Sequence, residues 1–169
     1  MPRTPIQAVA FLLGFWFALW LSPFSAGASE DPSRALFPEL ERSLHEEVNR
    51  VRATQHLIPL HRSAELDAVA RAHSLDMVRR NYLAHESPEG QNAIHRLASS
   101  RIDGFTLAAE NIGSTNRPNP SREIVTKWIE SPVHRQNLFA PPFNTTGIGI
   151  ARSATGAVIV TQLYLTYPR

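Results

Sequence analysis

The sequence predicts an α+β domain in which helices flank a small antiparallel sheet. Apolar residues recur at three- and four-residue steps through much of the region that follows residue 36, as in helices with one buried face. The last third of the chain instead holds two β-rich runs separated by a turn. With 169 residues, 43% hydrophobic and 19% charged, the chain suits one globular domain.

The N-terminus has the layout of a secretory signal peptide. Arg3 precedes an uncharged apolar run over 8–21, which is shorter than the roughly 20 residues that a bilayer-spanning helix needs. Ala26 and Ala28 then occupy the −3 and −1 positions of a cleavage site. We therefore expect residues 1–28 to be removed after Ala28. An uncleaved N-terminal anchor is the alternative, and the small residues before the predicted cut disfavour it.

The amino-acid composition limits the cellular compartments and the binding partners that we expect for this protein. The chain has no cysteine, so an exported domain of this size must rely on packing, and no cysteine can carry a lipid anchor. We expect a secreted or periplasmic bacterial protein that is monomeric and has no stable membrane anchor. The 17 basic residues are nearly balanced by 15 acidic ones, which gives no electrostatic case for nucleic acid.

Two amphipathic helices follow a short polar lead at 29–35. The first helix is expected over 37–56, and its apolar positions form one stripe: Phe37, Leu40, Leu44, Val48 and Val51. Ser63 is the expected N-cap of the second, over 63–81. Its stripe contains Leu66, Val69, Ala70, His73 and Met77. By its place in that stripe, His73 is interpreted as a core histidine rather than a ligand.

The next segment alternates loops with short elements. Ser87-Pro88 takes the chain out of the second helix and leaves His85 on a loop. A short helix with an exposed His95 is expected over 91–100. Residues 105–113 are expected to form a strand or extended segment, with Glu110 and Asn111 at its end.

A helix break precedes the last histidine. A helix is expected over 122–130, capped by Ser121, and it should end there because Ser131 precedes a proline. The same pair can begin a new helix, with Ser131 as N-cap and Pro132 at its first position. His134 would then be the third residue of that helix. An antiparallel hairpin is expected over 145–166, with its turn at 153–156.

Several kinds of active site can be excluded. The chain has no G-x-S-x-G elbow, P-loop or Cys-x-x-Cys pair. His85-Glu86 resembles the start of a zinc-protease H-E-x-x-H motif, but the fifth position is Glu89. Ser87-Pro88 also prevents the helix that this motif requires.

Three polar residues remain at places where the chain is expected to leave regular structure: His85, Glu110 and His134. Two neutral imidazoles can bind Zn²⁺ or a similar cation, and a carboxylate can ligate it, orient a histidine or accept a proton. Spacing alone leaves open that the three residues are unrelated.

The motif order resembles a known family. The segments LHEEVNRVRATQHLIPL, LDAVARAHSLDMVRRNYLAHESPEG, AENIG, WIESPVHRQNL and a GIGIA hairpin occur in sequence. This order is similar to that of the CAP superfamily (cysteine-rich secretory proteins, antigen 5 and pathogenesis-related proteins), in its cysteine-free bacterial SCP-like branch. The resemblance implies a CAP domain over 36–169 with an α-β-α sandwich fold.

The family also implies a site. In it, two histidines and one or two glutamates line a central cleft and can hold a divalent cation. Those positions fall on His85 and His134 as metal ligands, and on Glu110 of the A-E-N signature. The second family glutamate lies three residues after a tryptophan, where this chain has Ser131. Neighbouring Glu130 is the candidate substitute, and we expect Glu130, Ser131 and Asn111 to support the cleft.

Four functional hypotheses follow from the resemblance. The first is a secreted, non-catalytic domain that binds an extracellular ligand or protein through the cleft, with Zn²⁺ or another divalent cation at the histidines. The second is a metal-dependent, peptidase-like hydrolase with Glu110 as general base. In the third, Glu110 only accepts backbone amides and the site is structural. Lipid binding, the fourth, needs an apolar groove that the sequence does not reveal.

Overall fold

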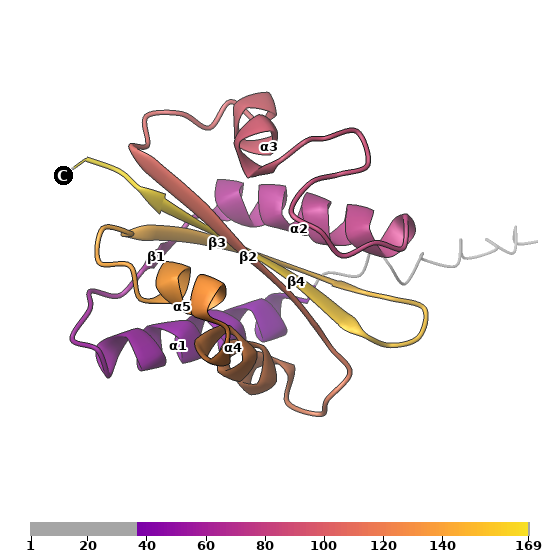
Figure 1. Ribbon diagram of the computed structural model, residues 1–169, viewed down its shortest axis with the longest axis horizontal. Helices are drawn as coiled ribbons and strands as arrows, with labels where there is room; N and C mark the ends of the chain where they lie inside the picture. Colours follow the sequence, from indigo (N-terminus) through magenta and orange to yellow (C-terminus); the bar gives the residue numbers. More distant parts are fainter. Residues whose placement is uncertain (1–36, 169) are drawn as a thin grey trace, which may run out of the picture.

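The computed structural model describes residues 37–168, and the predicted signal peptide and polar lead lie outside that range. The described residues form five helices and four strands (Figure 1), in the order α1 Pro38–Ala53, β1 His61–Arg62, α2 Ala64–Arg79, α3 Ala93–Ser99, β2 Leu107–Thr115, α4 Pro120–Glu130, α5 Pro132–Leu138, β3 Thr145–Arg152 and β4 Val158–Thr166. Within residues 37–168, none of the helices combines the length and hydrophobicity required to cross a bilayer.

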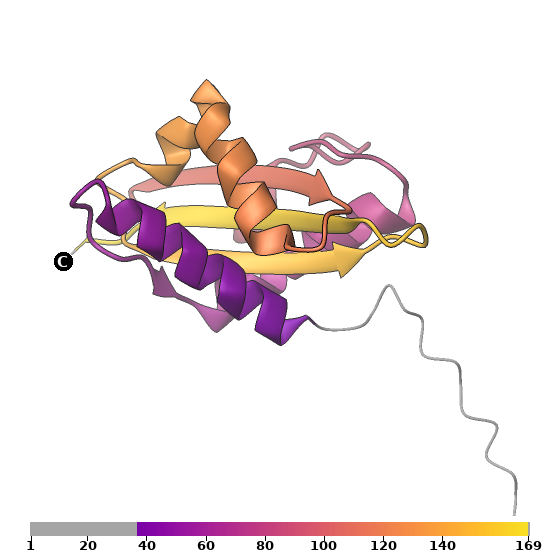
Figure 2. The ribbon, with the colours of Figure 1, turned by 90° about the horizontal axis from the view of Figure 1, so that it is seen from below.

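The elements form three layers, which confirms the predicted α-β-α sandwich. The sheet has the order β1-β3-β4-β2, so β2 is an edge strand. Helices α2 and α3 lie on one face, while α1, α4 and α5 lie on the other (Figures 1 and 2). The predicted hairpin is present, with β3 and β4 antiparallel, and β2 is also antiparallel to β4. The two-residue strand β1 pairs parallel to β3 and so adds one short parallel edge to this antiparallel sheet.

The GIGIA segment of β3 allows α2 to pack very close to the sheet. Side chains alternate between faces along β3, so its glycines and its isoleucines serve different layers. Gly147 and Gly149 lie against the backbone of α2 at Leu66 and Ala70, so closely that no Cβ would fit at either glycine. Ile148 and Ile150 point the other way and join the opposite core. The alternating glycines therefore let a helix backbone rest directly on the strand.

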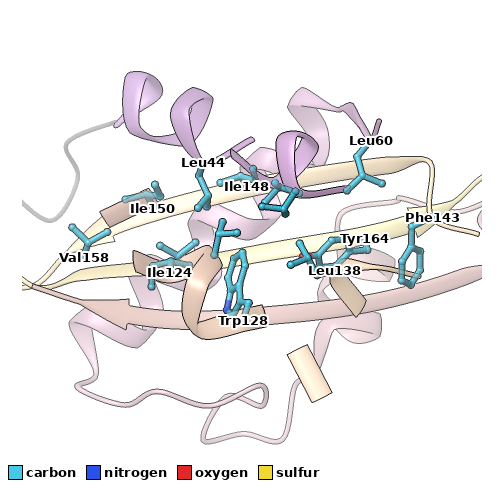
Figure 3. Close-up of a cluster of buried hydrophobic side chains, with 14 residues drawn as sticks. Leu44, Leu60, Ile124, Trp128, Leu138, Phe143, Ile148, Ile150, Val158 and Tyr164 are labelled. Carbon is cyan, nitrogen blue, oxygen red and sulfur yellow. The ribbon is translucent and has the colours of Figure 1, made fainter. Parts of the chain in front are cut away.

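The larger core lies between the sheet and helices α1, α4 and α5 (Figure 3). Trp128 of α4 is buried at its centre, as the amphipathic pattern predicted. The indole Nε1 of Trp128 donates to the backbone carbonyl of Ile112, 2.9 Å away, and so joins α4 to β2. A buried indole N–H needs an acceptor, and this bond provides it.

Helix starts follow the sequence in one case and differ in another. Ser63 caps α2 as expected, accepting a hydrogen bond from the amide of Leu66. The predicted Ser121 cap of α4 was wrong, because Asn119 is the N-cap and Pro120 takes the first helical position. Proline suits that position because it lacks an N–H and has a helical φ. Ser121 is instead buried in the first turn, and its hydroxyl has no hydrogen-bond partner in the described part of the chain.

Candidate functional site

The site is arranged around the edge strand β2. Glu110 and Asn111 were expected at the end of an extended segment, and this was wrong, since pairing with β4 continues to Thr115. The two residues therefore lie in mid-strand and project to opposite faces. Glu110 contacts side chains of the α2 and α3 layer, whereas Asn111 contacts α5. Glu110 and Asn111 therefore contact the helical layers on opposite faces of the sheet.

Glu110 is a buried carboxylate with both oxygens engaged. Its exposed fraction is 8%, and Oε2 accepts a hydrogen bond of 2.6 Å from the guanidinium of Arg96. Oε1 lies 2.9 Å from Nδ1 of His85. A carboxylate paired with arginine only accepts, so Nδ1 of His85 carries the proton. The Nε2 lone pair of His85 is left available to a ligand.

The loop that carries His85 is tied down from two helices. A turn from Ser87 to Gly90 shapes it, with Gly90 at a φ of +81°, where glycine is unstrained. From α3, Arg96 donates to the backbone carbonyl of His85. From the end of α2, Arg80 pairs with the Glu89 carboxylate in the same loop. The imidazole of His85 remains half exposed, with 51% of its side chain accessible.

The predicted break places His134 beside the strand. Ser131 is the N-cap of α5 and Pro132 its first residue, as expected, although the Ser131 side chain makes no capping bond. The Asn111 amide donates to the backbone carbonyl of His134, at 3.0 Å. Asn137 in turn donates to the Asn111 side chain and to the Glu110 carbonyl. Asn111 therefore holds α5, and with it His134, against β2.

The two histidines meet at the sheet edge from opposite layers. Their ring centroids are 6.4 Å apart. Burial, followed by the influence of His85, lowers the pKa of His134 below its usual value, which favours the neutral ring that a metal requires. Two imidazoles on one tetrahedral Zn²⁺, with Zn–N distances of about 2.0–2.1 Å, have ring centres about 5 Å apart, so these two rings would have to approach each other by about 1 Å to share an ion.

The remaining supporting residues contribute less. Glu130 is exposed at the end of α4, and in the described part of the chain the structure gives its side chain no hydrogen bond or ion pair. Within residues 37–168, no group of three or more histidine, cysteine or acidic side chains is arranged to hold a metal ion. The donor set for a cation is thus the two imidazoles, with Glu110 orienting one of them.

Most of the described chain matches a known protein family. The model of the cysteine-rich secretory protein family, CAP, matches residues 45–164. The chain belongs to the CAP family. It is 33% identical over 115 residues to the uncharacterized protein YkwD of Bacillus subtilis, covering 68% of this chain and 44% of YkwD. A second relative in that species, the uncharacterized membrane protein YlbC, is 30% identical over 112 residues. The chain spans less than half the length of each of these curated relatives.

Solved structures show the same CAP fold. An extracellular protein of Bacillus anthracis that contains an SCP domain is 27% identical, with a TM-score of 0.66 over 76% of this chain and 41% of that one. An outer surface protein of Borrelia burgdorferi, 19% identical, has a TM-score of 0.69 over 77% of this chain and 94% of its own. The bacterial matches and the absence of cysteine agree with the predicted cysteine-free branch.

His73 is a core residue of the CAP domain, as its position in the α2 stripe predicted. It is 2% exposed, and its Nε2 lies 3.1 Å from the Ala84 carbonyl. The same nitrogen is 4.0 Å from the Glu110 carboxylate, so His73 also borders the site. Burial, and then the positive charge of Arg96, lower the pKa of His73 below its usual value. The folded domain thus prefers a neutral ring at this position.

The lowered pKa of His73 predicts a loss of stability in acid. In the unfolded chain this ring takes up a proton near its ordinary pKa of about 6.5, whereas in the folded domain it does so only at lower pH. Its contribution is therefore complete above about pH 6.5 and is lost as the pH falls through the folded pKa. We expect the free energy of urea unfolding to fall more steeply between pH 7.5 and 5.5 in the wild type than in His73→Gln. Equal slopes would contradict this prediction.

Sequence reasoning missed Arg96. It lies on the short helix α3, next to the exposed His95 that drew attention, and nothing in its local pattern distinguishes it. Its guanidinium contacts β2 only because the fold brings α3 and this strand together, although they are separated in the sequence. Together with His73 it lines a pocket of about 290 Å³ between α2, α3 and the His85 loop. A larger pocket, of about 730 Å³, lies between the start of α1 and the β3–β4 hairpin.

Proposed function

We propose that this CAP domain is a non-catalytic binding module that works outside the cytoplasm, as a secreted or periplasmic protein. Its binding site consists of His85, Glu110 and His134, and its partner is an extracellular ligand or protein. The predicted signal peptide supports the location, and the related Bacillus anthracis structure is of an extracellular protein.

The observation that carries the proposal is the hydrogen bond from His85 to Glu110. A carboxylate that binds one imidazole nitrogen directs the other nitrogen outward and keeps it basic. The outward nitrogen of His85 then lies on the same sheet edge as the half-buried ring of His134. Two such nitrogens are acceptors for a donor group of a ligand, or ligands for a cation.

We further propose that His85 and His134 hold a divalent cation such as Zn²⁺. Two neutral imidazoles suit this ion, and the remaining coordination positions would be left to water or to the bound partner. A cation there would supply a Lewis-acidic point at which an anionic or carbonyl group of the partner docks. Glu110 orients the imidazole of His85 through its hydrogen bond to the ring. Asn111 positions the imidazole of His134 by donating a hydrogen bond to the backbone carbonyl of His134.

The geometry favours this binding role over hydrolysis. A general base needs a carboxylate oxygen within reach of the water that it deprotonates. In this site Oε1 of Glu110 is occupied by His85 and Oε2 by Arg96. The interpretation of Glu110 as the base of a metal-dependent hydrolase stays a prediction, and no contact of Glu110 within residues 37–168 specifically supports it.

Calorimetric titration with Zn²⁺ tests the cation site. We expect the double variant His85→Ala/His134→Ala to bind Zn²⁺ at least about tenfold more weakly than the wild type, because both proposed ligands are removed. The matched control is His61→Ala, which removes an exposed histidine of β1 at the opposite edge of the sheet. Equal Zn²⁺ affinity in the wild type and the double variant would eliminate the site.

A further inference from the structure

We infer that Arg96 is the positioning residue of this site: it holds Glu110 in the orientation that keeps the proton of His85 on Nδ1. The inference rests on the proposed function, because it concerns how the same site presents its ligand-binding nitrogen. It adds a residue from α3 to a site otherwise built from a loop, a strand and α5.

Arg96 donates hydrogen bonds to both residues of the His85–Glu110 pair. Its Nη2 donates to Oε2 of Glu110 at 2.6 Å, and its Nη1 donates to the backbone carbonyls of His85, at 3.2 Å, and Gln91, at 2.8 Å. The side chain is 11% exposed. One guanidinium therefore fixes the acid and the loop that bears the histidine relative to each other.

The planar fork of arginine suits this task. Its donors point in directions set by the guanidinium plane, so Nη1 and Nη2 serve acceptors on different elements at the same time. A lysine in the same place would bring the charge to Glu110 but would present its donors from a single atom. The contacts of Arg96 thus use both its charge and its shape.

Without Arg96, the Glu110 carboxylate would lose the hydrogen bond to Oε2 that holds it in its present orientation. Oε2 is in a buried carboxylate, and Arg96 is the only group in the described part of the chain to which the structure gives it a hydrogen bond. Removing that donor leaves Oε2 to seek another, by rotation of the carboxylate away from His85. The His85 ring would then lose the charged acceptor that selects the proton on Nδ1.

The experiment is metal-free nuclear magnetic resonance of the histidine ring nitrogens at a pH where the rings are neutral. In the wild type we expect His85 in the Nδ1-protonated form. In Arg96→Met we expect the ratio of the two tautomers to shift towards Nε2 protonation by about tenfold, the worth of one charge-assisted hydrogen bond. Arg96→Lys, which keeps the charge, should restore most of the wild-type ratio.

Arg80→Met is the matched control. Arg80 fastens the same loop through Glu89, and the hydrogen bonds and ion pairs of its side chain within residues 37–168 join it to Glu89 and Asp76. We expect no change of the His85 tautomer in this variant. An equal shift in Arg80→Met and Arg96→Met would overturn the inference, since loop tethering alone would then explain it. An unchanged tautomer in Arg96→Met would also overturn it.

The test remains decisive if Arg96→Met does not fold. Arg96→Gln then takes its place, since it retains an amide donor for the loop carbonyls but carries no charge. A wild-type tautomer ratio in that variant would overturn the inference. The readout needs no metal, so the expected tautomer shift together with no Zn²⁺ binding would leave Arg96 as a positioning residue and refute the cation site alone.

Discussion

Replacing Gly149 by alanine is expected to destabilise the domain by about 3 kcal/mol or more. A Cβ at this position would lie far inside contact distance of the α2 backbone at Ala70 and Arg71. A flexible side chain could move aside at little cost. A helix backbone moves only with the whole helix, and α2 covers both β3 and β4.

Urea unfolding of Gly149→Ala measures this effect. The control is Gly156→Ala in the β3–β4 turn, where a Cβ meets nothing within 4 Å but φ is +85°. Backbone strain there should cost about 1–2 kcal/mol. Gly149 does not have such a φ, so Gly149→Ala carries the steric clash without this strain and should lose more stability than Gly156→Ala. Similar losses in both variants would contradict the close packing of α2 on β3.

Replacing Arg52 by methionine is expected to cost about 3 kcal/mol of folding free energy. Arg52 lies in the last turn of α1 with its side chain fully buried, and burial lowers its pKa below the usual value. Its guanidinium donates to four backbone carbonyls: those of Ile58, Leu138, Ala140 and Phe143.

Two opposing effects decide whether Arg52→Met stabilises or destabilises the folded domain. Methionine removes the cost of burying a charge, which favours the variant. It also leaves several buried carbonyls without a donor, at about 1–3 kcal/mol each, and this loss is the larger. Since most of those carbonyls belong to the segment from α5 to β3, the same change should loosen α5, which carries His134.

Equilibrium unfolding of Arg52→Met provides the measurement. Arg50→Met is the control on the same helix, because Arg50 is exposed and its side-chain hydrogen bonds in the described part of the chain go to Glu47 in the adjacent turn. We expect no measurable loss of stability in that control. Equal stability of the two variants would show that the carbonyl contacts of Arg52 do not contribute.

The helices, the hairpin and the break at Ser131-Pro132 could be predicted from sequence because each depends on local signals. Apolar spacing identified the buried faces of α1 and α2, and a proline at the first position of a helix both ended α4 and began α5. The errors were of the same local kind. Asn119 competed with Ser121 as a cap, and β1 is too short to show a pattern.

The candidate residues His85, Glu110 and His134 were also identifiable from the sequence, through the order of motifs that resembles the CAP family. What brings them together is not local. Strand pairing puts Glu110 and Asn111 on opposite faces of β2, and each face then receives one histidine from a different layer.

The sequence by itself determined the class of fold, the family and which side chains were candidates, because periodicity, caps and motif order are written in neighbouring residues. Only the tertiary structure decided that Arg96 holds Glu110, that Glu110 orients His85 and that glycines at 147 and 149 admit the α2 backbone. These contacts join elements far apart in the chain, and their geometry depends on strand register and layer packing, which no local pattern encodes.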